Sequence, residues 1–212
     1  MIKIKNVSLT IKKTDILKQI NLELESGKIH GLVGRNGSGK TMLMKCICGF
    51  VYPTRGTIKI DGKCVGKDMD FPEDIGVIIE TPGFIPYMNG FDNLKILAGC
   101  KKKISLEQIR QAMEKVELDP ESKLHVRKYS LGMRQRLGIA QAIMEDPQLL
   151  ILDEPFNGLD EDGVQLVRNV LKEKREQGKT IILSSHNSED IRLLCDTVHR
   201  LYKGKIVNMN EE

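Results

Sequence analysis

The segment from Gly34 to Thr41 has the residue types and spacing of a phosphate-binding loop. It consists of Gly34, Arg35, Asn36, Gly37, Ser38, Gly39, Lys40 and Thr41, which fits G-x-x-x-x-G-K-[S/T], and it lies between an apolar run and an expected helix. Glycines let the backbone curl so that N–H groups point at phosphate oxygens, and the positive end of the following helix adds to that field. Lys40 is suited to neutralise the β- and γ-phosphates, and Thr41 to ligate Mg²⁺. The segment therefore predicts binding of a nucleoside triphosphate; the alternative is a glycine-rich turn that fits by chance.

Two carboxylates follow a second apolar run. Leu149–Leu152 is wholly apolar, and Asp153 and Glu154 come directly after it. A buried parallel strand delivers the residues at its carboxyl end to the ligand crevice of an α/β sheet. There Asp153 is suited to hold Mg²⁺ through water, and Glu154 to polarise the attacking water as a general base. The alternative is a strand that ends in two solvated acids, but the phosphate loop upstream favours the catalytic interpretation.

Three further segments narrow the choice of family. Residues 129–136 read Tyr-Ser-Leu-Gly-Met-Arg-Gln-Arg, residues 157–160 read Asn-Gly-Leu-Asp, and His186 ends the apolar run that begins at Ile181. With these segments in this order, the sequence resembles the ATP-binding cassette (ABC) ATPases over nearly its whole length. The resemblance implies that the ligand is ATP with Mg²⁺ and that the reaction is ATP hydrolysis.

Residues 129–136 correspond to the signature motif of that family. Its serine and glycine contact the γ-phosphate that the opposite subunit binds, which assigns Ser130 and Gly132 to a site completed in trans. The family has glycine where this chain has Leu131 and glutamine where it has Met133. The resemblance therefore implies a head-to-tail homodimer in the ATP-bound state.

Two more single residues take roles from the resemblance. Asp160 corresponds to the D-loop aspartate, which links the two sites of the dimer. His186 corresponds to the switch histidine, which hydrogen-bonds the γ-phosphate and positions the water. A lone histidine at such a place would be interpreted as structural. His186, however, follows the other motifs in the order that the family has, which favours the catalytic role.

Two further positions depart from the family pattern. The family stacks an aromatic residue on adenine before the second strand, and counting back from Leu17 that place is Ile11, which offers only weaker apolar contact. After residues 75–79, where the family has glutamine, stands Glu80. An ionised glutamate offers a charged oxygen and no donor, so Glu80 is a third candidate ligand for Mg²⁺ beside Thr41 and Asp153. The alternative is that Glu80 points to solvent and caps a loop.

Residues 80–84, Glu-Thr-Pro-Gly-Phe, narrow the resemblance further. Together with the Ser-Leu-Gly-Met signature they resemble the cassettes of bacitracin- and lantibiotic-type peptide exporters. Such cassettes work with a separate integral membrane permease, which implies a cytoplasmic protein held peripherally at the inner face of the membrane. A surface helix of the permease is expected to dock against Phe84, Ile85, Tyr87 and Met88, although these residues could equally be local core.

The order of elements predicts an α/β fold in one domain, residues 1–212. Strands alternate with helices, which favours a parallel sheet with right-handed crossovers. We expect residues 1–83 and 143–212 to form an α/β core with an N-terminal antiparallel β subdomain. Residues 84–142 are expected to form an inserted helical lobe, in which Ser105 and Gln108 make a capping box. In the terms of the resemblance, this is the P-loop NTPase (RecA-type) core.

Composition excludes several classes of protein. Lys and Arg number 33 against 29 Asp and Glu, a formal charge of +4, and the basic residues are scattered among acids, which argues against a nucleic-acid partner. Residues 101–103 are the compact basic run, and they read as a solvated helix end. No apolar run approaches the ~20 residues of a membrane span. The five cysteines and the lack of an export signal fit a reducing cytosol.

Three functions compete on this sequence. The first is a transport ATPase. The second is a non-transport ABC ATPase of chromosome or ribosome type; chromosome-type cassettes need a long coiled coil before the signature, and ribosome-type members usually carry two cassettes. The third is a module that holds ATP without turnover, against which Glu154 and His186 argue. The first function is favoured, and its cargo is left open because specificity lies in the membrane partner.

Overall fold

The computed structural model describes residues 1–101 and 104–207, and the strands within them form two sheets. The first sheet is antiparallel, in the order β2 (Thr14–Leu24), β1 (Ile2–Ile11), β4 (Arg55–Ile60), β5 (Lys63–Cys64). The second runs in the order β10 (Lys205–Val207), β9 (Thr197–Tyr202), β3 (Ile29–Val33), β8 (Thr180–Ser184), β7 (Leu149–Leu152), β6 (Ile75–Ile78). It is parallel apart from its β10–β9 pair. The predicted α/β class, with an N-terminal antiparallel part, is confirmed.

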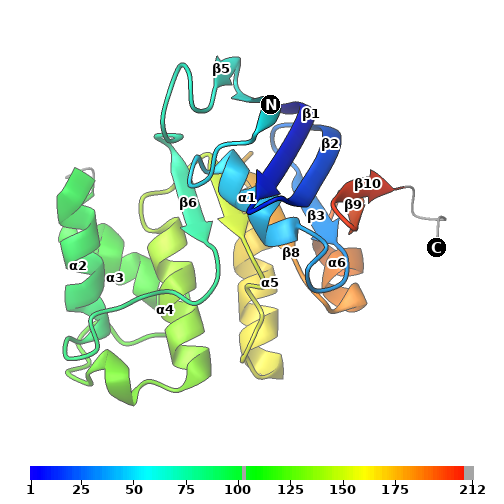
Figure 1. Ribbon diagram of the computed structural model, residues 1–212. Helices are drawn as coiled ribbons and strands as arrows, with labels where there is room; N and C mark the ends of the chain where they lie inside the picture. Colours follow the sequence, from blue (N-terminus) through cyan, green and yellow to red (C-terminus); the bar gives the residue numbers. More distant parts are fainter. Residues whose placement is uncertain (102–103, 208–212) are drawn as a thin grey trace.

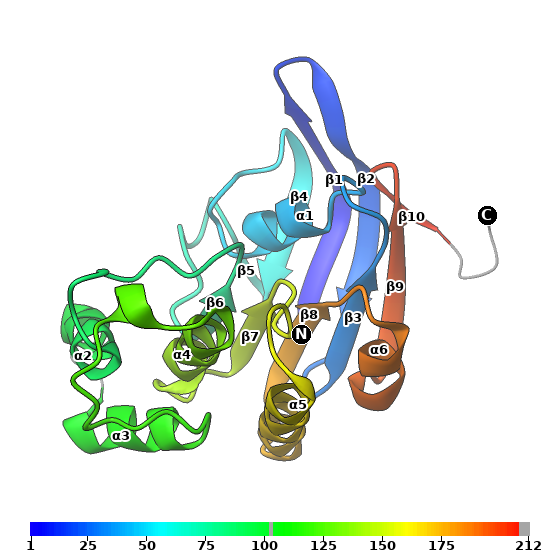
Figure 2. The same ribbon diagram turned by 90° about the horizontal axis from the view of Figure 1, so that it is seen from below.

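Helices cover the parallel sheet on both faces (Figure 2). On one side lie α1 and the antiparallel sheet, and on the other lie α4, α5 and α6. The bounds of the helices in the described residues are α1 (Lys40–Ile47), α2 (Gly90–Lys101), α3 (Leu106–Glu114), α4 (Leu131–Ile143), α5 (Glu161–Glu176) and α6 (Ser188–Leu194), with a 3₁₀ turn at Val126–Lys128.

The alternation of side chains along β7 explains why its sequence is uniformly apolar. Leu149 and Ile151 join the cluster that packs β1, β2 and α1 against the sheet. Leu150 and Leu152 point the other way, into the cluster that includes α4 and α5. All four residues are buried, as expected of a parallel strand covered on both faces. The strand that ends at Asp153 is therefore held rigidly between two cores.

The helices α2, α3 and α4 lie together at one side of the molecule (Figure 1). The capping box at Ser105 is present, since its hydroxyl accepts from the N–H of Gln108 and the Gln108 side chain accepts from the N–H of Ser105. Leu106, Ile109, Met113 and Val116 recur at helical spacing, and the last three are buried, whereas Leu106 at the first turn of α3 is 49% exposed. The domain limits 84 and 142 stay a prediction. The side chains of the basic run 101–103 lie outside the described residues.

A charge cluster ties the end of the lobe to the core. The Asp146 carboxylate, in the loop between α4 and β7, accepts from Lys174 Nζ at 2.6 Å and from Lys179 Nζ at 2.9 Å. Both lysines are buried, at 6% and 5% exposure. Partial burial opposes ionisation of Asp146, but the two lysine hydrogen bonds outweigh it, so the pKa of this carboxyl lies below its ordinary value.

We expect Asp146→Asn to lower the free energy of unfolding by about 1 kcal/mol. Two buried ammonium groups lose their counter-charge, but the Asp146 side chain is 57% exposed, so solvent screens the interaction. The folded-state pKa of Asp146 is depressed, so its contribution to stability is present above the unfolded-state pKa of about 4 and is lost as the pH falls through the folded-state pKa. Urea unfolding of both proteins at pH 7 and pH 3 measures this. If the parent exceeds Asp146→Asn in stability by the same amount at pH 3 as at pH 7, the stabilising role of the Asp146 carboxylate is contradicted.

Candidate nucleotide site

The phosphate-binding loop connects β3 to α1. Gly39 is the N-cap of α1 and has a φ of 111°, a conformation that favours glycine. A Cβ at Gly34 would lie 2.3 Å from the carbonyl oxygen of Leu201, so this position has no room for a side chain. The Lys40 side chain folds back over the loop, and its Nζ donates to the Gly34 carbonyl at 2.6 Å. The structure brings all eight predicted residues into this one turn.

Two buried polar groups in the loop fit a phosphate ligand. Lys40 is only 7% exposed. The hydroxyl of Ser38 is buried and, within the described part of the chain, has no hydrogen-bond partner. A buried unpartnered hydroxyl calls for an explanation, and an anion held between it, the lysine and the N-terminus of α1 supplies one.

The carboxyl ends of β7 and β8 bring the acidic residues against α1. The Thr41 hydroxyl donates to Asp153 Oδ2 at 2.5 Å, although Thr41 and Asp153 lie far apart in the sequence. On the other side, the Ser184 hydroxyl donates to Asp153 Oδ1 at 2.6 Å. Asp153 is 9% exposed. The two predicted magnesium ligands Thr41 and Asp153 are therefore adjacent, and Ser184 orients the carboxylate from behind.

Glu154 and His186 face each other one residue further along these strands. His186 Nε2 lies 3.2 Å from Glu154 Oε1, and the His186 backbone N–H donates to Oε2 at 3.2 Å. The backbone of Glu154 has a φ of 52°, in the left-handed region that costs free energy for a residue with a side chain. Its N–H donates to the Ser184 hydroxyl at 3.0 Å, and Gln135 donates to the neighbouring carbonyl of Pro155 at 3.0 Å. These contacts hold the strained turn in place.

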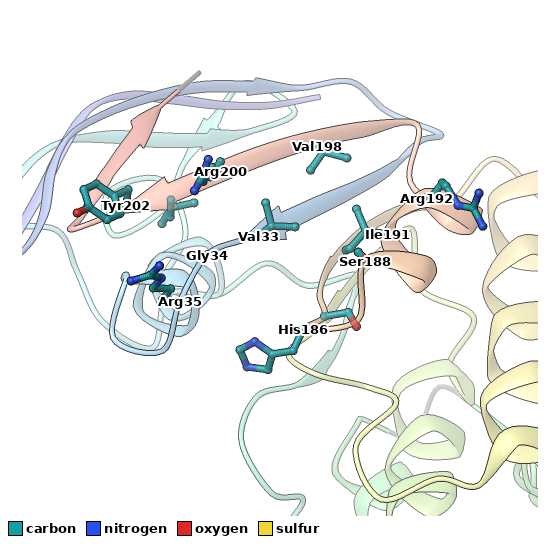
Figure 3. A pocket seen from close by; sticks show the side chains of 12 residues that line it. Val33, Gly34, Arg35, His186, Ser188, Ile191, Arg192, Val198, Arg200 and Tyr202 are labelled. Atoms are coloured by element: carbon teal, nitrogen blue, oxygen red, sulfur yellow. The ribbon is translucent and has the colours of Figure 1, made fainter. Parts of the chain in front are cut away.

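A cleft of about 760 Å³ opens beside the loop (Figure 3). Gly34 and Arg35 line one wall and His186 another, with Arg192 and Tyr202 further along. The start of the phosphate loop and His186 therefore border a common space, but Lys40, Asp153 and Glu154 do not line it. His186 is half-exposed and its side chain points into that space.

The residues of the predicted signature motif lie apart from the cleft beside the phosphate loop. Ser130 is the N-cap of α4, where its hydroxyl accepts from the N–H of Met133 at 3.1 Å. Leu131 is 54% exposed and packs over Gly158 of the D-loop segment. With Gly132, these residues line a second cleft, of about 640 Å³, which shares no lining residue with the first. The structure does not bring the signature to the phosphate loop of the same chain.

Asp160 of the D-loop also lines the second cleft. It is the N-cap of α5, and its carboxylate accepts from the N–H of Gly163 at 2.9 Å. Arg136 Nη2 of α4 lies 3.6 Å from the same carboxylate. The signature helix and the D-loop are thus joined directly.

Glu80 pairs with a residue that sequence reasoning missed. Its Oε1 lies 2.6 Å from Lys45 Nζ, on α1 one turn beyond Thr41. The Glu80 side chain is 66% exposed, and its φ is 62°. Among the described residues, no three His, Cys, Asp or Glu side chains gather in a group that could hold a metal. Glu80 as a metal ligand stays a prediction, which requires the side chain to turn from Lys45 toward Thr41.

Ile11 also stays a prediction. It is 39% exposed at the end of β1, opposite Thr14 on β2. The part of β2 that approaches the phosphate loop is the backbone at Ile16, whose carbonyl oxygen would lie 3.3 Å from a Cβ at Gly39. A contact of Ile11 with the base is compatible with its exposure.

Comparisons with known proteins place the chain in a family. A family model described as "ABC transporter" matches residues 17–157. The uncharacterized ABC transporter ATP-binding protein YybJ of Bacillus subtilis (strain 168) is 45% identical, over 97% of this chain and 94% of that protein. The bacitracin transport ATP-binding protein BcrA of Enterococcus faecalis is 41% identical, over 98% and 68%. The lantibiotic transport ATP-binding protein SrtF of Streptococcus pyogenes is 38% identical, over 98% and 89%.

Solved structures agree with the fold. A dimeric post-hydrolysis structure of an ATP-binding cassette bound to ADP and Pi has a TM-score of 0.88 at 24% identity, covering 98% of this chain and 97% of that one. An ATP-binding subunit of an ABC transporter has a TM-score of 0.87 at 25% identity, covering 97% and 88%. None of the helices in the described residues is long and apolar enough to cross a membrane. The resemblance drawn from the motifs is confirmed: the chain belongs to the ABC transporter family, as an ATP-binding cassette that hydrolyses ATP to drive transport.

Proposed function

We propose that the chain powers export of a peptide antibiotic through a separate integral membrane permease, as a head-to-tail homodimer when ATP is bound. The observation that carries this proposal is the similarity to the bacitracin and lantibiotic transport proteins along nearly the whole chain. The protein is then cytoplasmic and peripheral, held at the inner face of the membrane by the permease.

Mg²⁺ fits the oxygen ligands at the end of β7. Thr41 Oγ1 and Asp153 Oδ2 are hard oxygen donors already adjacent at 2.5 Å. Mg²⁺ is usually held by one or two protein oxygens together with substrate phosphates and water, so two ligands are enough. When bound, the ion offsets charge on the β- and γ-phosphates. Lys40 then binds the phosphates, His186 orients the γ-phosphate, and Glu154 accepts the proton of the attacking water.

The separation of the two clefts supports the homodimer. Ser130 and Gly132 line a cleft that also carries the acidic residues Glu117 and Asp119, whereas the cleft at the phosphate loop carries Arg35 and Arg192. Head-to-tail pairing that sets these two clefts against each other would match opposite charges, which favours association. It also supplies the signature that each site lacks within its own chain.

The surface beside Glu80 suits a permease helix. Ile85 and Tyr87 are 45% and 67% exposed. Phe84 is partly buried against the core, so among the predicted docking residues it belongs to the packing of the chain itself. Nearby, a groove of about 280 Å³ is lined by apolar side chains that include Phe50, Pro82 and Leu97. Exposed apolar side chains around a groove are typical of a docking surface.

The proposed function is tested by isolating the cassette from membranes and identifying the membrane protein that co-purifies. That pair is then expressed in a strain sensitive to bacitracin and to lantibiotics, beside the same pair carrying Glu154→Gln. We expect the parent pair, and not the variant pair, to raise the inhibitory concentration of one of these peptides. Resistance that is equal in both strains would exclude ATP-driven peptide export by this chain.

The ion pair of Glu80 gives a separate prediction. We expect Glu80→Gln to keep the ATPase rate within about tenfold, a barrier change of ~1.4 kcal/mol or less. An exposed pair such as Glu80–Lys45 contributes at most about 1 kcal/mol, so the side chain is free to exchange Lys45 for Mg²⁺. The cost of the change is expected in the coupling of hydrolysis to the permease, because the same loop lies beside the docking surface.

The measurement compares Mg²⁺ titrations and ATPase rates of the parent, Glu80→Gln and Glu80→Ala, each with and without the permease. Lys45→Ala is the matched control for the ion pair alone. Superimposable titrations and coupled rates in all these proteins would leave Glu80 a surface residue.

A further inference from the structure

A buried ion pair lies behind the loop that carries His186 from β8 to α6. Asp190 on α6 is 2% exposed, and Arg168 on α5 is 9% exposed. Arg168 donates to Asp190 Oδ1 from Nε at 3.0 Å and from Nη2 at 2.5 Å. A pair buried this deeply is costly to assemble, and apolar residues of similar volume are often as stabilising, so its presence is weak evidence for a role in stability.

The second oxygen of Asp190 connects this pair to the loop. Asp190 Oδ2 accepts from the Ser185 hydroxyl at 2.8 Å, and the same hydroxyl accepts from the backbone N–H of Asn187 at 3.1 Å. Ser185 is 7% exposed. One buried hydroxyl therefore fixes the residues on both sides of His186.

His186 depends on this loop for its position. Its side chain is 51% exposed, so little packing holds the ring itself. Its backbone N–H and its Nε2 each lie 3.2 Å from a different oxygen of Glu154. The backbone path from Ser185 to Asn187 places the His186 N–H directly, and it places the Cα from which the ring reaches Glu154.

Arg168, the other member of the pair, lies on the helix that follows the D-loop. Arg168 lies on α5, which begins directly after its N-cap Asp160. Arg168 is eight positions after Asp160, a rise of about 12 Å at 1.5 Å per residue. Val167 and Leu171, on either side of Arg168, are fully buried, so this part of α5 is packed into the core.

We propose that Arg168, Asp190 and Ser185 are positioning residues for ATP hydrolysis, which hold the His186 loop against Glu154 and tie it to the helix that begins at Asp160. The inference rests on the role proposed above for His186. A displacement of Asp160 by a second copy of the chain is then transmitted along α5, through the ion pair and the Ser185 hydroxyl, to His186.

Ser185→Ala tests this with little risk to the fold, because the Arg168–Asp190 pair remains whole. We expect kcat to fall by about 10- to 100-fold, the effect of a misplaced catalytic group, while the Kd for ATP stays within about twofold. Ser185→Thr retains the hydroxyl and is expected to restore most of kcat. A kcat of Ser185→Ala equal to that of the parent would overturn the proposal.

Two comparisons separate positioning from stability. Asp146→Asn breaks the charge cluster at the other end of α5 and is the control, with lower stability and unchanged kcat. In the His186→Ala background, Ser185→Ala is expected to cause no further loss of kcat, because both changes act through one group. If the kcat of the double variant is reduced by the product of the two single reductions, the proposal is overturned. If His186→Ala alone keeps the parental kcat, the role proposed for His186 fails first, which is a different result.

Discussion

Glu154→Gln is expected to lower the turnover of ATP by about 100- to 10,000-fold, the range of general-base catalysis, and to leave ATP binding intact. The amide oxygen of glutamine can still accept from the His186 backbone N–H, which now meets Glu154 Oε2 at 3.2 Å. What the variant lacks is a group that takes a proton from water at neutral pH. The site is therefore assembled but cannot complete the reaction.

The same variant is expected to accumulate the homodimer. Without hydrolysis, ATP and Mg²⁺ stay between the two chains, and size-exclusion chromatography with saturating MgATP should show the dimer. The matched control is Glu176→Gln, an exposed glutamate at the end of α5, which should turn over ATP like the parent. A Glu154→Gln protein that elutes as monomer under these conditions would count against the head-to-tail mechanism.

The fold and the positions of the site residues were predicted from apolar runs and from the order of motifs. The apolar run Leu149–Leu152 indicated a strand covered on both faces, and the structure buries all four residues. Because parallel strands end at a common edge, the order of motifs also indicated that Asp153, Glu154 and His186 meet near the phosphate loop. The hydrogen bond of Thr41 to Asp153 and the contact of His186 with Glu154 are what that geometry predicts.

The supporting residues were not predictable in this way. Ser184 donates to Asp153, and Lys45 pairs with Glu80, but neither belongs to a pattern with a fixed spacing. Arg168 and Asp190 read in the sequence as ordinary charges on two helices, and only packing of α5 against α6 shows that they form a buried pair. Contacts between distant segments depend on the register of whole elements, which no local pattern encodes.

Lys40→Ala is expected to raise the Kd for ATP by roughly 30- to 150-fold, which corresponds to a loss of about 2 to 3 kcal/mol of charge-assisted hydrogen bonding. Two effects combine in this variant. The phosphates lose a cation that is 7% exposed, and water screens so buried a charge only weakly. The loop also loses the hydrogen bond from Lys40 Nζ to the Gly34 carbonyl, which holds its two ends together at 2.6 Å.

The comparison with His186→Ala decides whether binding and turnover are carried by different residues. His186 is half-exposed and reaches the site from β8, so its loss should leave the Kd for ATP within about threefold, about 0.7 kcal/mol. Its turnover should nevertheless fall by about 100-fold or more, because the γ-phosphate and Glu154 lose the group between them. Equilibrium titration with ATP and single-turnover hydrolysis, with Lys172→Ala as an exposed lysine control, measure the two quantities separately. Equal losses of ATP affinity in Lys40→Ala and His186→Ala would show that His186 serves binding, and the assignment of His186 to the transition state would then be wrong.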